Sequence, residues 1–329
     1  MPLHNAESRE KNGVWRPICD PNAGYAYSLS DAISNLVANH RDAFLPVDDG
    51  TMIIGSDYSG QHKGAKHEAY SFLVTTLQAI TDWEPARQAV RSHWLRDERR
   101  MSFKQLRDSV RWKALVPFLN CAFMLRGNLV TVLVDRRITT WVDGGVAALI
   151  TEVPEAFPSD VKSGSAEKIY TLSTLIAMLI SGLRREDQPS IWISDHDETL
   201  DSHDRRESIA YLSSLLTFGF TRWRKPAPMS FGTTEMQHAP PWAEDFTAIP
   251  DLIAGAFATM AADLPAFFRT TQWSATLNPE KIQDRRAKAI AEWLRHPKNP
   301  MKHNLLRLEC DGETVRASAQ QFKTAINPD

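Results

Sequence analysis

The sequence predicts an α/β fold with a mixed sheet flanked by helices, and two observations lead to that prediction. Apolar segments rich in strand-forming residues alternate along the chain with segments of helical periodicity. Three of the strand candidates also end in an aspartate, namely Asp57, Asp135 and Asp195. Because ligand sites in open α/β sheets lie beyond the carboxyl ends of the strands, these aspartates are predicted to lie at the edge of the sheet where active sites usually form.

The strand candidates are short apolar runs bounded by turn-forming residues, and they span residues 51–57, 70–77, 128–135 and 190–195. The first two suit a hairpin with a long loop. The helix candidates place apolar residues three or four apart and span residues 30–39, 82–99, 106–125, 168–183, 204–218, 250–262 and 279–296. In the helix over 250–262, Pro250 falls in the first turn, where its missing N–H does no harm.

These elements divide the chain into three parts. Residues 1–50 are expected to form an N-terminal arm or cap, residues 51–263 the main domain, and residues 264–329 a C-terminal helical tail. A chain of 329 residues can bury a full core without disulfides or a structural metal.

Charge and cysteine content limit the class of protein. The formal net charge is −2, so no global positive field attracts nucleic acid, and such binding needs a local patch. The 3 cysteines lie far apart, which argues against a disulfide framework or a cysteine zinc site. The polar N-terminus lacks the apolar segment of a signal peptide, and the apolar stretch over 172–183 is too short to span a bilayer. We therefore expect a cytoplasmic protein with no membrane partner.

The aspartates at the strand ends suggest a metal site. Carboxylates that converge repel one another, and burying them together requires a compensating cation or proton. Mg²⁺ and Mn²⁺ are hard ions that prefer oxygen ligands, and a pair of them can activate water for attack on a phosphodiester. The alternative for each aspartate is that it caps the turn or helix after its strand.

Read together, five segments resemble domain-of-unknown-function family number 3800, which belongs to the ribonuclease H-like superfamily. The resemblance covers residues 51–262 and rests on these matches: Asp57-Tyr58-Ser59-Gly60 after the first strand, Ser102-Phe103-Lys104, Val134-Asp135, Ile193-Ser194-Asp195, and Asp251-Leu252-Ile253-Ala254-Gly255. It implies a ribonuclease H-like mixed sheet and a nuclease that uses Mg²⁺ or Mn²⁺ on RNA or DNA. The company that such families keep suggests a bacterial antiviral defence or mobile-element system. A nucleic acid is then the substrate, and a protein partner is a further expectation.

The resemblance also assigns roles to residues. It implies that Asp57, on the central strand, Asp195 and Asp251 bind the metal ions, with Asp251 in the first turn of the closing helix. Lys104 would orient the scissile phosphate. Further candidates of lower rank for the site are Glu98, Asp135, Asp197 and Glu198.

A basic cluster supports a polyanionic partner. Residues 87–113 contain nine basic side chains against three acidic ones, and two tryptophans lie among them. Several of the basic residues are three or four apart and share helix faces. Those predicted to contact nucleic acid are Arg96, Arg99, Arg100, Arg107 and Arg111. The alternative is a solvated helix face.

Two other functions remain open. Tyr58 stands where the family has a glutamate, which favours a catalytically inactive ribonuclease H-like subunit that binds nucleic acid in a larger complex. Separately, Asp195, Asp197 and Thr199 follow a strand with the spacing of the nucleophile loop of haloacid dehalogenase-type phosphatases. In that chemistry Asp195 would attack phosphorus and Asp197 would act as general acid and base.

Overall fold

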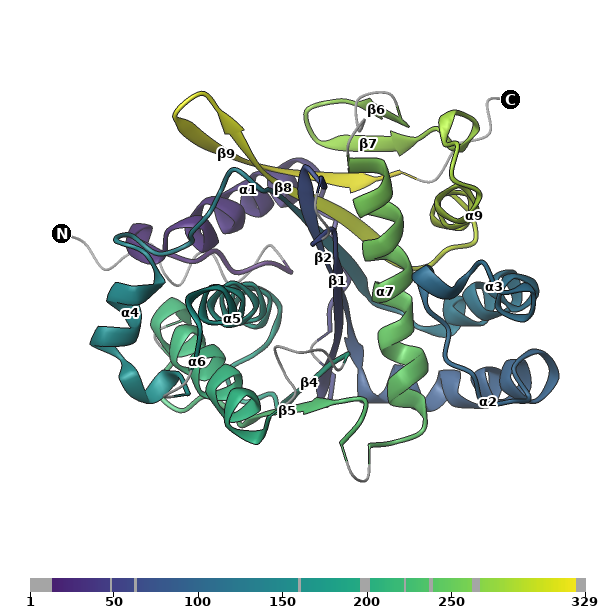
Figure 1. Cartoon of the computed structure of the whole chain (residues 1–329), viewed down its shortest axis with the longest axis horizontal. Coiled ribbons are helices and arrows are strands. Elements are labelled where there is room, and N and C mark those ends of the chain that lie inside the picture. Colours follow the sequence, from purple (N-terminus) through teal and green to yellow (C-terminus); the bar gives the residue numbers. More distant parts are fainter. Residues whose placement is uncertain are drawn as a thin grey trace.

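Nine strands among the described residues form one mixed sheet with the order β5-β4-β1-β2-β3-β8-β9-β7-β6. The structure is a computed structural model of the chain, and it describes residues 14–47, 49–61, 64–158, 161–195, 202–221, 223–236, 239–261 and 267–323. Helices cover both faces of the sheet (Figure 1). The predicted α/β fold with a mixed sheet flanked by helices is therefore confirmed.

The strands are β1 (Met52–Ser59), β2 (His67–Thr76), β3 (Asn128–Asp135), β4 (Ser190–Ser194), β5 (Met229–Thr233), β6 (Phe268–Thr270), β7 (Ser274–Leu277), β8 (Lys302–Asp311) and β9 (Thr314–Phe322). The α-helices are α1 (Tyr25–Asn39), α2 (Leu77–Trp94), α3 (Ser109–Cys121), α4 (Val146–Glu152), α5 (Ser163–Leu183), α6 (His203–Thr221), α7 (Trp242–Met260) and α9 (Arg285–Leu294). Short 3-10 turns include η3 (Phe103–Gln105).

The strands β1, β2 and β3 form an antiparallel meander, in agreement with the hairpin expected from the sequence. On the other side of β1, the strands β4 and β5 run parallel to it. The carboxyl ends of β1, β4 and β5 consequently meet at one edge of the sheet, which is the edge where the aspartates were predicted to lie.

Successive side chains of a strand point to opposite faces of the sheet, and the apolar ones form two separate cores. Ile53 of β1 packs into the core beneath α2, α3, α7 and α9, whereas Met52 and Ile54 pack into the core beneath α1 and α5. Figure 1 shows these two groups of helices on opposite sides of the sheet. A residue of β1 therefore faces one core or the other according to its position in the strand.

The C-terminal part differs from the prediction. The segment predicted as a helical tail contains α9 but also β6 to β9, and β8 pairs in parallel with β3, so that it lies inside the sheet. The sequences of β8 and β9 mix polar with apolar residues, which is why they carried no clear strand signal. Likewise α1 is longer than the short helix expected at 30–39, and it buries an apolar face over the sheet.

The helix α7 also begins earlier than predicted. It starts at Trp242, directly after the Pro240-Pro241 pair, and Pro250 lies inside it. The sequence favoured a start at Pro250 because proline is accommodated best in the first turn. Asp251 consequently lies in the middle of α7, where the free N–H groups of a helix start are absent.

The helix α5 is apolar enough, by length and composition, to cross a membrane. However, 83% of its apolar stretch is buried inside the protein, as in the core helix of a soluble domain.

Two glycines let α7 approach its neighbours closely. A Cβ atom on Gly55 of β1 would lie 2.7 Å from a ring carbon of Phe246, and a Cβ on Gly255 would lie 2.3 Å from Cγ of Phe103. Both distances are far below van der Waals contact. The glycines thus allow α7 to lie directly on β1 and allow Phe103 to pack on α7.

We expect Gly255→Ala to lower the free energy of unfolding by about 1–3 kcal/mol, because the added methyl group must displace Phe103 from its packed position. Chemical denaturation measures this change. The matched control is Gly219→Ala in α6, where no atom lies within 4 Å of the new Cβ. That variant should gain about 0.5–1 kcal/mol from its better helix propensity. Equal effects at the two positions would contradict the packing explanation.

Candidate active site

Parallel pairing brings Asp57 and Asp195 to neighbouring positions. Ser56 of β1 is in register with Ser194 of β4, and the N–H of Asp195 donates to the carbonyl of Ser56 over 3.3 Å. Asp57 is the next residue of β1 and Asp195 follows β4 directly. Asp57 has the same strand parity as Ile53 and Gly55, so its side chain belongs to the face covered by α7.

Asp251 approaches this face from α7. Its Oδ2 atom accepts a hydrogen bond of 2.7 Å from the N–H of Phe103, and the hydroxyl of Ser102 binds it as well. The loop before η3 therefore satisfies Asp251 without a helix start. This contact also joins two of the segments on which the family resemblance rests.

The pKa values indicate that the three carboxylates share one electrostatic environment. Burial raises the pKa of Asp57 well above its usual range, and the charges of Asp251 and Asp195 raise it further. Burial also raises the pKa of Asp251, although the N–H of Phe103 and the charge of Arg100 oppose the shift. The structure thus brings together the three aspartates that the sequence placed on separate elements.

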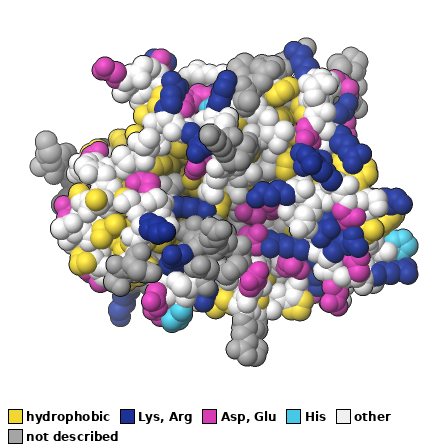
Figure 2. All heavy atoms as spheres, viewed as in Figure 1, with side chains coloured by type: hydrophobic (Ala, Val, Ile, Leu, Met, Phe, Trp, Pro, Cys, Tyr) yellow, Lys and Arg dark blue, Asp and Glu magenta, His cyan; other side chains and the backbone are white. Residues whose placement is uncertain are grey.

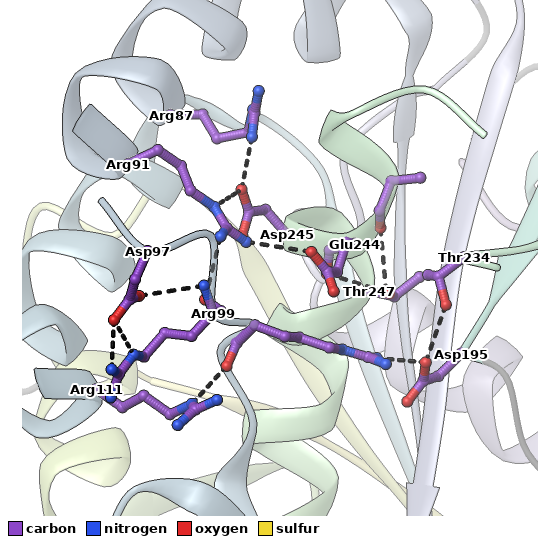
Figure 3. A network of polar contacts seen from close by, with 12 residues as sticks. Arg87, Arg91, Asp97, Arg99, Arg111, Asp195, Thr234, Glu244, Asp245 and Thr247 are labelled. Atoms are coloured by element: carbon purple, nitrogen blue, oxygen red, sulfur yellow. Dashed lines mark hydrogen bonds and ion pairs between the residues drawn. The ribbon is translucent and has the colours of Figure 1, made fainter. Parts of the chain in front are cut away.

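Arg100 supplies the positive charge at this cluster. Its guanidinium forms an ion pair with Asp195, which also accepts a 3.1 Å hydrogen bond from the hydroxyl of Thr234 (Figure 3). Burial alone would lower the pKa of Arg100, but the charges of Asp195, Asp57 and Asp251 outweigh burial and raise it. The guanidinium therefore interacts with all three carboxylates.

A buried acid on α7 organises the arginines of α2. Asp245 is completely buried, and its Oδ2 atom accepts hydrogen bonds from Nη1 of Arg87 at 2.7 Å and from Nε of Arg91 at 2.8 Å (Figure 3). Arg91 also donates to the carbonyl of Arg99 over 3.1 Å. Through Arg91, this network connects α7 with the loop that contains Arg100.

The basic cluster is largely engaged inside the protein. Arg99 pairs with Asp97 and Asp108, and Arg111 pairs with Asp108 and donates to the carbonyl of Arg100. Of the five arginines predicted to contact nucleic acid, Arg96 and Arg107 are exposed. The other three are Arg99, Arg100 and Arg111, whose positive charges are matched by nearby carboxylates.

Of the remaining candidates, Lys104, Glu98 and Asp135 lie among the described residues. Lys104 is exposed in η3, next to the residue whose N–H binds Asp251, and Glu98 is exposed in a turn with φ of 59°. Asp135 ends β3, where hydrogen bonds from Arg137 lower its pKa to about 2. It therefore behaves as a turn-capping residue, as the alternative interpretation proposed. Asp197 and Glu198 lie outside the described residues.

Tyr58 faces the opposite side of the sheet from Asp57. Its ring packs against the core beneath α5, with Nζ of Lys168 3.9 Å above the ring centre. Position 58 therefore points away from the three aspartates. The residue that departs from the family pattern does not remove a ligand from this cluster.

The donor set suits a hard divalent ion in its chemistry, because the three carboxylates of Asp57, Asp195 and Asp251 offer only oxygen ligands. Within the described ranges, no three His, Cys, Asp or Glu side chains are arranged to hold a metal ion. Arg100 instead engages Asp195. Binding of a metal ion at Asp195 would therefore compete with the ion pair between Arg100 and Asp195.

Sequence reasoning missed Arg100, Asp245 and Thr234 as parts of this site. Arg100 was assigned to phosphate contact because its charge appeared uncompensated in the local sequence. Its partner lies 95 positions later in the chain. Asp245 lies before the helix predicted over 250–262, so the sequence carried no clear signal for it.

We expect Asp57→Asn to raise the melting temperature at neutral pH in the presence of a chelator. The unfolded aspartate ionises near about pH 3.9, whereas the folded one holds its proton to higher pH. The wild-type protein therefore loses stability as the pH rises from the pKa of the unfolded aspartate through the higher pKa of the folded one. The difference between variant and wild type should shrink toward about pH 4.

Asp135→Asn is a control for which we expect the opposite change in melting temperature at neutral pH. The pKa of Asp135 is lowered to about 2, so its charge stabilises the folded protein at neutral pH. The variant should melt below the wild type. If Asp57→Asn melts below the wild type at neutral pH, the buried charge of Asp57 does not destabilise the folded protein, and the explanation by repulsion among the three aspartates is wrong.

We expect Asp245→Ala to lower the free energy of unfolding by about 3–5 kcal/mol, because it leaves two guanidinium groups without their buried partner. Glu244→Ala is the matched control, since Glu244 is half-exposed and lies 3.5 Å from Arg91. It should cost less than about 1 kcal/mol. Urea unfolding of both variants tests whether the buried acid fastens α2 to α7.

Comparison with known proteins adds no family to this description. No protein-family model matches the chain, and a search of curated proteins gave no match.

Proposed function

We propose that the protein is a divalent-metal-dependent nuclease with a ribonuclease H-like domain. One observation carries the proposal: aspartates from β1, from the end of β4 and from α7 meet at the carboxyl edge of parallel strands, where burial and mutual repulsion raise the pKa values of two of them. Such a cluster favours binding of a doubly charged cation. Carboxylates at this edge are also where α/β sheets place their chemistry.

Asp57, Asp195 and Asp251 would hold Mg²⁺ or Mn²⁺, which supplies Lewis-acid activation of water and of the phosphodiester. In the net reaction a water oxygen bonds to phosphorus, the bond from phosphorus to the leaving oxygen breaks, and the proton ends on that oxygen.

The surface beside the cluster supports a nucleic-acid substrate. Lys and Arg side chains, interspersed with acidic ones, are numerous over α2, α3 and α9, on the right half of Figure 2. Lys104 in η3 and Arg107 in the turn before α3 are exposed, and Trp94 is 38% exposed at the end of α2. Exposed aromatic rings near basic side chains can stack on unpaired bases. A cytoplasmic location and a role in bacterial defence belong to the same proposal.

A second candidate is a nucleic-acid-binding subunit without catalysis. The Arg100–Asp195 ion pair favours it, because a guanidinium already neutralises part of the cluster. The phosphatase interpretation rests on Asp195 together with Asp197, which lies outside the described residues. In the described structure Asp195 is held by Arg100 and Thr234.

We expect cleavage of at least one substrate in a panel of single- and double-stranded RNA and DNA with Mg²⁺ or Mn²⁺, and none with chelator. Asp57→Ala should lower the rate by at least about 100-fold, because loss of even a supporting contact at a metal site has effects of that size. Gel analysis of labelled oligonucleotides measures both results.

The control is Asp187→Ala, an exposed carboxylate that pairs with Arg185 outside the cluster. It should cleave at the wild-type rate. Cleavage by Asp57→Ala at the wild-type rate would overturn the assignment. Absence of cleavage together with binding of the oligonucleotides would favour the binding subunit.

A further inference from the structure

Arg100 occupies an unusual position for a phosphate-binding residue. It forms an ion pair with Asp195 and interacts electrostatically with Asp57 and Asp251, and about a quarter of its side-chain surface remains exposed. The guanidinium is therefore paired within the acidic cluster, while part of the Arg100 side chain remains exposed to solvent.

The main chain around Arg100 is fixed, so that motion is confined to the side chain. The carbonyl of Arg100 accepts a 2.6 Å hydrogen bond from Nε of Arg111, and the preceding carbonyl accepts one from Arg91. Leu95 and Met101, on either side of the loop, are buried. A ligand that draws the guanidinium away from Asp195 thus needs only side-chain rotation.

The hydrogen bonds of the guanidinium are incomplete. Its Nε atom is buried and has no hydrogen-bond partner among the residues that the structure describes. A buried donor without an acceptor is unfavourable, so the ion pair with Asp195 leaves part of the guanidinium unsatisfied. A phosphate can offer two oxygens to the planar fork of arginine, and could thus pair with donors that the contact with Asp195 leaves unsatisfied.

A divalent ion and the guanidinium compete for Asp195. The Oδ1 atom of Asp195 is engaged by both Arg100 and Thr234. A metal ion that uses this carboxylate must displace Arg100 or lie against a like charge, and repulsion between like charges is strong in a partly buried site. The ion pair therefore lowers the affinity of the cluster for metal.

We propose that Arg100 couples the binding of the divalent ion to the binding of a phosphodiester, by holding Asp195 until a phosphate takes the guanidinium. This inference rests on the proposed nuclease function. Because coupling between two ligands is reciprocal, the nucleic acid strengthens metal binding and the metal strengthens nucleic-acid binding by the same factor. Arg100 acts here as a positioning residue.

The experiment measures Mn²⁺ affinity of the full chain by electron paramagnetic resonance, with and without short single-stranded phosphorothioate DNA or RNA. In the wild type, the oligonucleotide should tighten Mn²⁺ binding by at least about fivefold. Arg100→Gln should bind Mn²⁺ at least about tenfold more tightly than wild type without oligonucleotide, and should lose most of the oligonucleotide effect. Arg185→Gln, a charge change at an exposed residue outside the cluster, should match the wild type.

The outcomes separate the two proposals. If the wild type binds Mn²⁺ and Arg100→Gln binds it equally or more weakly, the coupling is overturned and the metal site is retained. No Mn²⁺ binding by any variant overturns the metal site and the coupling together. If Arg100→Gln fails to melt cooperatively, Arg100→Lys carries the test, because it keeps the charge but loses the planar fork. An oligonucleotide effect as large in Arg100→Lys as in the wild type also overturns the proposal.

Discussion

Repulsion among three carboxylates at one edge of the sheet is the constraint on which the architecture around the site depends. Parallel pairing of β1 with β4 makes Asp57 and Asp195 neighbours, and α7 adds Asp251 from above. Without a nearby positive charge, the carboxylates of such a cluster would move apart or take up protons. Among the described residues, the guanidinium of Arg100 supplies positive charge to the cluster, and hydrogen bonds to the carbonyls of Arg99 and Arg100 hold the main chain of its loop.

The helix α7 connects the stability of the domain with this chemistry. It carries Asp251, which belongs to the cluster, and Asp245, which holds two arginines of α2 in the interior. Gly55 of β1 allows α7 to lie against that strand, and Gly255 of α7 allows Phe103 to pack on the helix. The same helix therefore fixes the distance between the sheet and the loop of Arg100, and changes in its packing are transmitted to the cluster.

Much of the central fold could be predicted because its strands are apolar runs with clear boundaries, and β3 matches its predicted range of 128–135 in full. The three aspartates could be predicted because each ends a strand or belongs to a recognisable segment. The strand β8 could not, since its residues owe their burial to β3, which precedes them by more than 160 positions. Nor could the role of Arg100, because a local count of charges does not reveal acids that reach it from β1, β4 and α7.

The position of β8 between β3 and β9 has a consequence for synthesis of the protein on the ribosome. Until residue 302 and those after it have left the exit tunnel, the nascent chain exposes the edge of β3 with its N–H and C=O groups unpaired. Such edges join readily with strands of other chains. Premature termination between β5 and β8 would thus release a polypeptide whose strands β1 to β5 are complete but in which the edge of β3 is unpaired, a species suited to aggregation and to recognition by chaperones.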